Sequence, residues 1–328
     1  MKILLILLFA PLIALALLYF VFPGRLVALG RALLRQRGRM VQKSVTVDGR
    51  NWPYLEGGDP AKRLLLLVHG FAGDKDNWSM IAPYLTRDYH VIAPDLPGFG
   101  ENERNPDLAY DLGAQTARLK QFADTLGLVR PHVGGNSMGG WIALRYAIDY
   151  PDALASLILL NNAGVNGQHE SDLQKQAANE DYNPLVLAGL EDADRLVGMV
   201  VHKPPYIPAR LKPVLYADAL KYRDQLDGIF WTIANEGRDH PLNDRLGEVR
   251  APTLIIWGRH DRLLDVSCVP VLEAGIAGSQ SHVFEHVGHV PMIEDPKATA
   301  AVMKAFLAQH PVAPAQAGAA GVLSNGAG

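Results

Sequence analysis

A serine between glycines carries the clearest chemical signal in the sequence. Ser137 lies at the centre of the run Gly135-Asn136-Ser137-Met138-Gly139, which follows an apolar segment and opens a helical pattern. A tight turn from a strand into a helix needs small residues around the serine and leaves its hydroxyl exposed to a substrate carbonyl. We therefore expect Ser137 to be the nucleophile of an acyl-transfer reaction.

A serine hydroxyl is a weak nucleophile at neutral pH, so it needs a base, and the base needs an acid that orients it. In proteins with this serine turn, the acid and then the histidine follow the serine along the chain. His289 comes in a loop directly after the last apolar run, and Asp261 comes at the end of the preceding run. The sequence therefore predicts His289 as general base and Asp261 as the orienting acid.

Two residues close to this acid are alternatives. Asp265 also follows the apolar run, but it lies where a helix begins, and an aspartate there is a natural cap. His260 adjoins the acid in sequence and precedes the last strand-like run. We interpret Asp265 as a helix cap and His260 as a loop residue.

The reaction also needs hydrogen-bond donors for the oxyanion of the tetrahedral intermediate, usually two backbone amides. Met138 directly follows the nucleophile and is expected to supply one amide. The other is expected from Phe71, in the loop His69-Gly70-Phe71-Ala72-Gly73 after an apolar run, with His69 supporting that loop. The turn at 95–100 is interpreted as structural.

Short apolar runs alternate with helical patterns along most of the chain, which predicts an α/β fold with a mostly parallel sheet covered by helices. After two extended runs near 45–47 and 52–55, strands are expected at 64–68, 91–94, 132–134, 157–160, 253–257 and 282–284. Helices are expected at 78–85, 112–126, 138–150, 266–276 and 297–309.

The alternation is interrupted between about 166 and 246, where prolines break helical charge patterns. This stretch predicts a helical cap inserted over the strand ends. Its apolar residues would suit an acyl chain, or they could simply pack the cap onto the core. They are Leu185, Val186, Leu187, Leu190, Val197, Val200, Val201, Ile229, Phe230 and Trp231.

The amino-terminal segment from Ile3 to Phe22 contains no charged residue and is apolar apart from Pro11 and Tyr19. About 20 such residues can span a bilayer, so we expect an uncleaved membrane anchor. A cleaved signal peptide is the alternative, but its apolar region should be shorter and end in small residues.

A basic segment follows the anchor. Its arginines alternate with spaced leucines, which favours an amphipathic helix on anionic lipid headgroups over a solvated linker. The positive charge on this flank, which includes Lys43, predicts that the catalytic part stays on the cytoplasmic side. The arginines are Arg25, Arg31, Arg35, Arg37 and Arg39.

Composition narrows the partners and cofactors. The chain has 328 residues, and its formal net charge of -3 gives no overall basic field, so nucleic acid is not an expected partner. The single cysteine, Cys268, excludes an intrachain disulfide and a Cys-based zinc cluster. Neither a phosphate-binding loop nor a metal-ligand pattern occurs, so no cofactor and no metal are expected.

From about Val45 to His310 the chain resembles the α/β-hydrolase superfamily, with the motifs in the family's order. The runs 69–78 and 288–294 and the serine turn resemble bacterial lipases of the Moraxella type and membrane-anchored mammalian monoacylglycerol lipases. The resemblance implies a lipid ester such as an acylglycerol as substrate, reached from the membrane, and the bacterial inner membrane as location. It implies a catalytic triad of Ser137, Asp261 and His289. It also implies an oxyanion hole formed by the backbone amides of Phe71 and Met138.

The sequence patterns and the resemblance together divide the chain into segments. We expect an anchor at 1–22 and a basic linker helix at 23–42, so that residues 1–40 contact the membrane. The hydrolase core is expected at 43–165 and 246–310, separated by a cap at 166–245. A disordered tail is expected at 311–328, where charged side chains are absent. The cap varies within the family, so the resemblance implies nothing about acyl-chain length.

Two other functions are weighed. Carbon-carbon bond hydrolases of the meta-cleavage-product type resemble the chain at 135–140 and 257–262, but they favour a different oxyanion loop and tend to carry tryptophan where this chain has Val290. A membrane-tethered binding module without activity would require loss of the triad, which is complete here. Dehalogenases and epoxide hydrolases of the fold use an aspartate nucleophile, and Ser137 argues against both.

Overall fold

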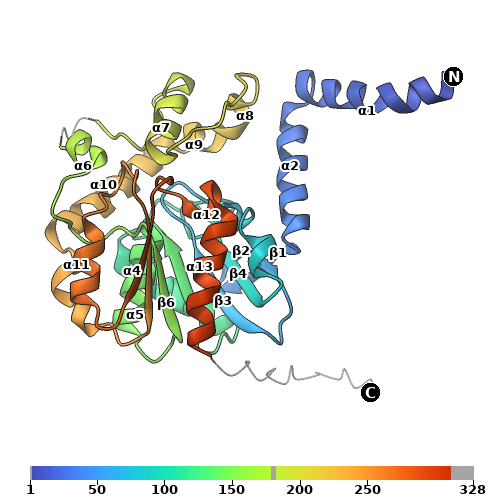
Figure 1. Cartoon of the computed structure of the whole chain (residues 1–328). Coiled ribbons are helices and arrows are strands. Elements are labelled where there is room, and N and C mark those ends of the chain that lie inside the picture. The colour runs from blue at the N-terminus through green and yellow to red at the C-terminus, as the bar shows by residue number, and fades with distance from the viewer. Residues whose placement is uncertain (1, 179–181, 312–328) are drawn as a thin grey trace, which may run out of the picture.

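An eight-stranded sheet forms the centre of the molecule, in a computed structural model that describes residues 2–178 and 182–311, with side chains from Pro11 onward (Figure 1). The strand order is β1-β2-β4-β3-β5-β6-β7-β8. β2 pairs antiparallel with β1 and β4, and the remaining pairs are parallel. The strands are β1 Met40–Val47, β2 Arg50–Gly57, β3 Arg63–Val68, β4 Tyr89–Pro94, β5 His132–Asn136, β6 Ser156–Leu160, β7 Thr253–Gly258 and β8 Gln280–Phe284.

Helices cover both faces of the sheet, which explains why the central strands are apolar throughout. Within β3, Leu66 packs in one buried cluster, and Leu65 and Leu67 pack in the cluster on the opposite face. The first cluster includes α4 Leu112–Thr125, α5 Met138–Asp149 and α11 Cys268–Gly275. The second includes α3 Ala82–Leu85, α12 Pro291–Glu294 and α13 Pro296–Gln309.

The predicted α/β-hydrolase fold is confirmed, and its strands lie where the apolar runs indicated. One helix differs from its prediction. The stretch 78–85 is divided into the 3-10 helix η1 Lys75–Trp78 and α3, which has a proline in its first turn. A proline lacks the backbone donor that a continuous helix would need at that point.

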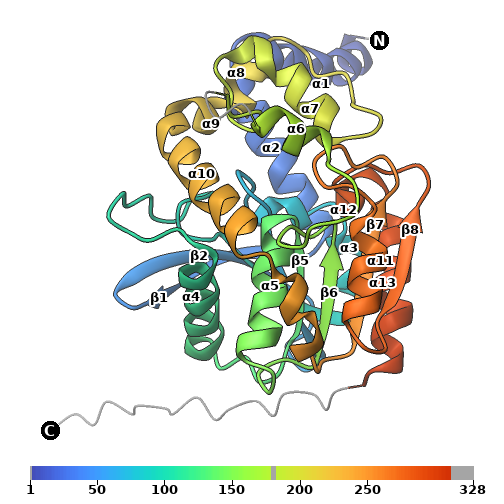
Figure 2. The same cartoon turned by 90° about the vertical axis from the view of Figure 1, so that its left-hand side faces the viewer.

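A group of helices between β6 and β7 lies over the carboxyl ends of the parallel strands (Figure 2). This is where the sequence predicted a cap, and ligands of open α/β sheets bind at this edge. The segment contains α6 Asp172–Ala177, η2 Leu190–Asp192, α7 Ala193–Val200, α8 Lys212–Leu215, α9 Ala217–Lys221, α10 Arg223–Asp239 and η3 Leu242–Glu248.

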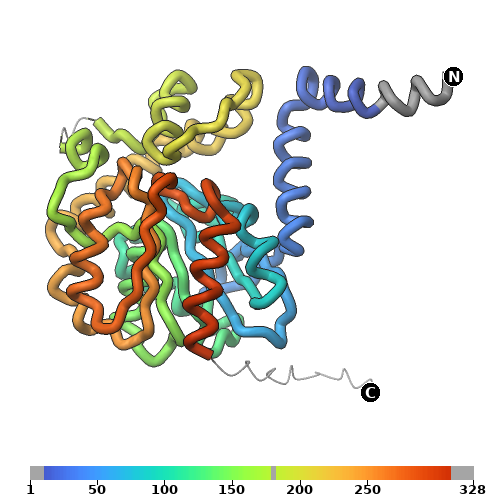
Figure 3. The backbone as a smooth tube through the Cα atoms, viewed as in Figure 1, coloured from blue at the N-terminus to red at the C-terminus, as the bar shows by residue number. Residues whose placement is uncertain are grey.

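Two helices precede the sheet, and the second of them leads into its β1 edge (Figure 3). They are α1 Lys2–Phe20 and α2 Pro23–Arg37. Among the residues whose side chains are described, from Pro11 onward, no single helix has both the length and the apolar character to cross a membrane. Pro11–Phe20 and Pro23–Arg37 meet both criteria only as a pair, which is bent by 117°.

The basic helix is shorter than the predicted segment 23–42. α2 ends at Arg37, Gly38 caps it, and Arg39 has a positive φ of 51°. A residue in this left-handed conformation stops the helix, and Met40 already begins β1. Of the predicted tail, residues 312–328 lie outside the described part of the chain.

Candidate active site

Ser137 occupies the sharp turn between β5 and α5. Its φ of 57° and ψ of -122° are strained for a residue with a side chain, and such strain is typical of a nucleophile held at a turn. The backbone holds the turn in place, because the Ser137 amide donates to the carbonyl of Leu160 at 3.1 Å and its carbonyl accepts from Ala163 at 3.0 Å.

The glycines of the turn are required by close backbone contacts. A Cβ atom on Gly139 would lie 2.2 Å from the carbonyl oxygen of Val68, and one on Gly135 would lie 2.1 Å from that of Gly139. Contacts this short exclude any side chain. The start of α5 can therefore approach β3 closely only because these positions are glycine.

His289 and Asp261 meet at the carboxyl ends of the last strands. His289 Nδ1 lies 2.8 Å from Asp261 Oδ2, and both side chains are almost completely buried. The other carboxylate oxygen accepts from the amides of Leu263 at 2.8 Å and Leu264 at 3.0 Å. With Nδ1–H directed at a carboxylate, Nε2 is left as the proton acceptor of the ring.

Neither alternative residue takes part in this pair. The Asp265 carboxylate accepts from the Ser267 amide at 2.9 Å, in the turn ahead of α11, whose N-cap is Ser267 and not the predicted Asp265. The His260 ring stacks on His202 with centroids 3.8 Å apart. The residue whose carboxylate lies against His289 is thus Asp261.

The two amides expected for the oxyanion hole come from elements next to Ser137. Met138 is the first residue of α5, where a helix leaves its amide without an internal partner. Phe71 follows Gly70, and a Cβ on Gly70 would lie only 3.1 Å from Ser137 Cβ. In the described part of the chain, no backbone hydrogen bond outside the regular helices and strands has either of these amides as its donor.

His69 supports this loop, as predicted. Its Nδ1 lies 2.8 Å from the carbonyl oxygen of Gly70, and its Nε2 accepts from the Leu96 amide at 3.0 Å. Burial lowers the pKa of His69 and keeps the ring neutral, because a protonated ring could not accept the Leu96 hydrogen bond.

A cavity of about 560 Å³ opens beside Ser137 and the two amide residues. Its walls come from the turn, from the loop after β6 and from the cap helix α10. Among the apolar cap residues considered above, Leu185, Phe230 and Trp231 line the cavity, whereas Leu187 and Ile229 are buried. Other apolar residues around the cavity are Met138, Trp141, Leu173, Ile233, Leu263 and Leu264.

Known proteins with this architecture match most of the chain. A family model described as the alpha/beta hydrolase fold matches residues 63–189. Lipase 1 of Psychrobacter immobilis is 36% identical over 276 residues, which cover 83% of this chain and 86% of the lipase. A monoacylglycerol lipase of Xenopus laevis is 30% identical over 312 residues and covers 92% of each chain. The chain belongs to the α/β-hydrolase family.

A solved structure resembles this α/β-hydrolase over almost the whole chain. A bacterial membrane phospholipase A has a TM-score of 0.84 and 39% sequence identity, and the match covers 94% of this chain and 99% of that one. With these relatives and its serine turn, the α/β-hydrolase is a serine hydrolase.

Two residues at the hydrolase site were not found from the sequence. Asn161, at the end of β6 with a φ of 45°, donates to Asp261 Oδ2 at 2.6 Å. Glu294 accepts from the amides of Gly288 at 3.0 Å and Val290 at 3.2 Å, on either side of the histidine. For Asn161, the signal in the sequence was an asparagine at the end of a strand. For Glu294, the signal was a carboxylate shortly after the histidine.

Proposed function

We propose that this hydrolase cleaves carboxylic esters of lipids, with acylglycerols as the substrate class, through an acyl-enzyme on Ser137. The observation that carries the proposal is the buried pair of His289 and Asp261 beside a strained serine turn, with an apolar cavity at the serine. The lipase and the monoacylglycerol lipase among its relatives support the same substrate class.

In the proposed reaction, Ser137 Oγ attacks the ester carbonyl carbon while His289 Nε2 takes the hydroxyl proton. The oxyanion accepts hydrogen bonds from the amides of Phe71 and Met138. The alcohol leaves with the proton from His289, and the acyl group remains on the serine. Water then attacks the acyl-enzyme with His289 as base, which releases the fatty acid and restores the serine.

The cavity suits an acyl chain. Each buried methylene contributes about 0.8 kcal/mol, and the walls next to Ser137 are formed by large apolar side chains such as Trp141 and Phe230. We therefore infer that acyl chains bind under α10 while the ester group lies between Ser137 and Phe71.

We further infer that the enzyme associates with a membrane through residues 1–22, with the core and cap on the cytoplasmic side. Along α1 and the turn after it, large apolar side chains are exposed, and the membrane phospholipase A relative supports the inference. The exposed residues are Leu12, Ile13, Leu15, Leu17, Phe20, Val21 and Phe22. Arg31 and Arg35 in the next helix pair with acidic side chains of the core.

The test compares substrates on the purified enzyme and on Ser137→Ala. Monoacylglycerols of several chain lengths are assayed beside a carbon-carbon substrate of the meta-cleavage-product type. We expect turnover of the glycerol esters, lost in Ser137→Ala. Turnover of the carbon-carbon substrate alone would replace the proposed function with the alternative hydrolase activity, and turnover of neither would refute the ester proposal.

A further inference from the structure

The amino-terminal helix α2 contacts the loop that carries one of the two oxyanion amides. We call residues 69–78 the oxyanion loop. Near its end, Asp76 receives both arms of the Arg35 guanidinium, with Nε 2.7 Å from Oδ1 and Nη2 2.5 Å from Oδ2. The Arg35 side chain is 19% exposed and that of Asp76 is 11% exposed. Bidentate pairs of this kind fix geometry as well as charge.

Asp76 is joined by its own hydrogen bonds to Asp74 in the oxyanion loop and to Ser79 directly after the loop. Its amide donates to the Asp74 carboxylate at 2.8 Å, and its carboxylate accepts from the Ser79 hydroxyl at 3.0 Å. Burial by itself would raise the pKa of Asp76, but the hydrogen bond and charge of Arg35 outweigh burial and lower it. The carboxylate is therefore charged, and it ties the segment after Phe71 to α2.

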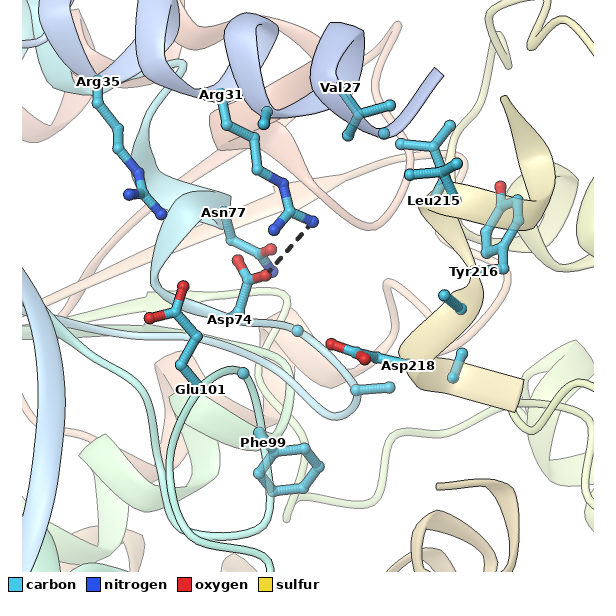
Figure 4. Close-up of a pocket in the computed structure, with 18 of the residues that line it drawn as sticks. Val27, Arg31, Arg35, Asp74, Asn77, Phe99, Glu101, Leu215, Tyr216 and Asp218 are labelled. Atoms are coloured by element: carbon cyan, nitrogen blue, oxygen red, sulfur yellow. Dashed lines mark ion pairs between the residues drawn. The ribbon is translucent and has the colours of Figure 1, made fainter. Parts of the chain in front are cut away.

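A second helix residue faces the same loop. Arg31 lies one turn earlier in α2, 3.9 Å from Asp74 (Figure 4). Both arginines point from the helix toward the loop, at the edge of a cavity of about 1120 Å³ that the cap residues Leu215 and Tyr216 also line. The polar contacts that α2 makes through Arg31 and Arg35 are therefore directed at the oxyanion loop.

The polar contact continues inward to a buried ion pair. Arg35 donates to Gln42 at 2.7 Å, and Gln42 donates to Glu101 at 2.5 Å. Glu101 lies 3.4 Å from Lys75, whose ammonium and amide both donate to the fully buried Asp95 at 2.7 Å. The oxyanion loop is thus held from inside through Lys75 and from outside through Arg35.

Close packing fixes the carboxyl end of α2. A Cβ on Gly38 would lie only 2.7 Å from Ala82 Cβ in α3. The helix therefore meets the core at a defined position, from which Arg35 can impose a defined position on Asp76.

We propose that Arg35 is a positioning residue of the oxyanion hole, through which α2 holds the loop that presents the Phe71 amide. The inference rests on the proposed function, because it assigns α2 a role in the reaction of that same site. An amide displaced by about 1 Å costs up to roughly 10²-fold in rate, and loss of a whole donor costs about 10² to 10³-fold. Arg35 touches no reacting atom and acts through Asp76.

The experiment uses the full-length enzyme and a soluble short-chain nitrophenyl ester, so that membrane binding is not involved. Arg35→Ala is compared with Arg35→Lys and with Arg37→Ala, which removes the same charge from an exposed position of the same helix. We expect Arg35→Ala to lower kcat about 10 to 100-fold with KM within twofold. Arg35→Lys should recover part of the loss, and Arg37→Ala should match the wild type.

A second readout separates this inference from the ester proposal. The rate at which a fluorophosphonate modifies Ser137 needs the same oxyanion donors but no ester turnover. We expect this rate to fall in Arg35→Ala in proportion to kcat, in samples that circular dichroism shows to be folded. Wild-type labelling without ester turnover would refute the ester function alone. Folded Arg35→Ala with wild-type labelling and turnover would overturn the positioning role.

Discussion

The hydrogen bonds around Asp261 explain why this aspartate, and not Asp265, partners the histidine. Both carboxylate oxygens are occupied, by His289 and Asn161 on one side and by two backbone amides on the other. These hydrogen bonds hold the carboxylate in one position beside the histidine. It can therefore hold the imidazole in one tautomer and stabilise the imidazolium formed during the reaction.

Asp261→Asn should lower kcat by roughly 10⁴-fold, because an amide at this position can donate to His289 and so favour the wrong tautomer. Asp265→Asn is the matched control, since the Asp265 carboxylate accepts from the Ser267 amide in the turn ahead of α11. Steady-state hydrolysis of a soluble ester measures both. A loss of similar size in the two variants would contradict the assignment.

Among individual residues, the sequence predicted those that belong to a motif and missed those that come together only in the folded chain. Ser137 and His289 were marked by their turns and strand ends. Asn161 contacts Asp261 across 100 positions of sequence, and local pattern does not report such a distance. Glu294 was missed for a related reason, because the amides that it binds belong to a loop without regular structure.

The packing of α5 against β3 sets the position of the nucleophile at the scale of elements. A Cβ on Gly139 would meet the carbonyl oxygens of Val68 at 2.2 Å and His69 at 2.4 Å. Backbone atoms cannot move aside as a flexible side chain can. The helix would have to withdraw from the strand that precedes the oxyanion loop.

Gly139→Ala should therefore lower Tm by roughly 10 °C or prevent folding, since forced overpacking on a rigid backbone ranks among the most destabilising changes. Gly228→Ala is the control: it lies inside α10, and its Cβ would have no neighbour within 4 Å. Alanine there should stabilise the helix by up to about 1 kcal/mol. Thermal unfolding by calorimetry distinguishes the two, and an unchanged Tm for Gly139→Ala would contradict the packing argument.

The start of β5 makes stability depend on pH. Burial, with smaller effects from Arg63 and His310, lowers the pKa of His132 to about 4. In the unfolded chain the pKa of this histidine is about 6.5. Between pH 6.5 and pH 4 the unfolded state therefore binds a proton at His132 that the folded state does not bind. The contribution of the neutral His132 ring to the free energy of unfolding is fully present above pH 6.5, and it is lost as the pH falls toward 4.

His132→Gln should remove this dependence, which amounts to about 3 kcal/mol between pH 6.5 and pH 4. Urea unfolding at pH 7.5, 5.5 and 4.5 measures the difference between wild type and variant. The exposed residue His169 provides the control, His169→Gln. Parallel loss of stability in wild type and His132→Gln on acidification would show that another group is responsible.

The strands and the cap followed from the sequence because apolar runs and their absence are local properties. The partner of α2 did not follow. Its arginines and leucines predicted a helix lying on lipid headgroups, whereas Arg35 binds Asp76, 41 positions away. A charge pattern shows that a helix face is polar, but the acidic group that faces it is decided by the folded chain.

At the scale of the whole molecule, the apolar surface of α1 and the polar contacts of α2 divide the amino-terminal region into two functions. Removal of residues 2–22 should leave turnover of a soluble ester within about twofold, because α2 and its contact with the oxyanion loop remain. Hydrolysis of monoacylglycerol in anionic vesicles should fall at least about tenfold, since exposed side chains such as Leu12 and Phe20 no longer bind the bilayer.

Assays of both proteins on the same ester in detergent micelles provide the control for this prediction. Equal activity of the truncated and full-length enzymes on vesicles would rule out membrane delivery by α1. An equal loss on soluble and vesicle-borne ester would instead place residues 2–22 in the catalytic structure.

The proposed reaction requires an acyl-enzyme on Ser137, which intact-mass spectrometry of enzyme quenched during ester turnover can detect. We predict a mass increase equal to the acyl group, located by digestion on the peptide that contains Ser137, and absent from Ser137→Ala together with turnover. If no adduct forms at Ser137 and ester turnover persists in Ser137→Ala, Ser137 is not the nucleophile.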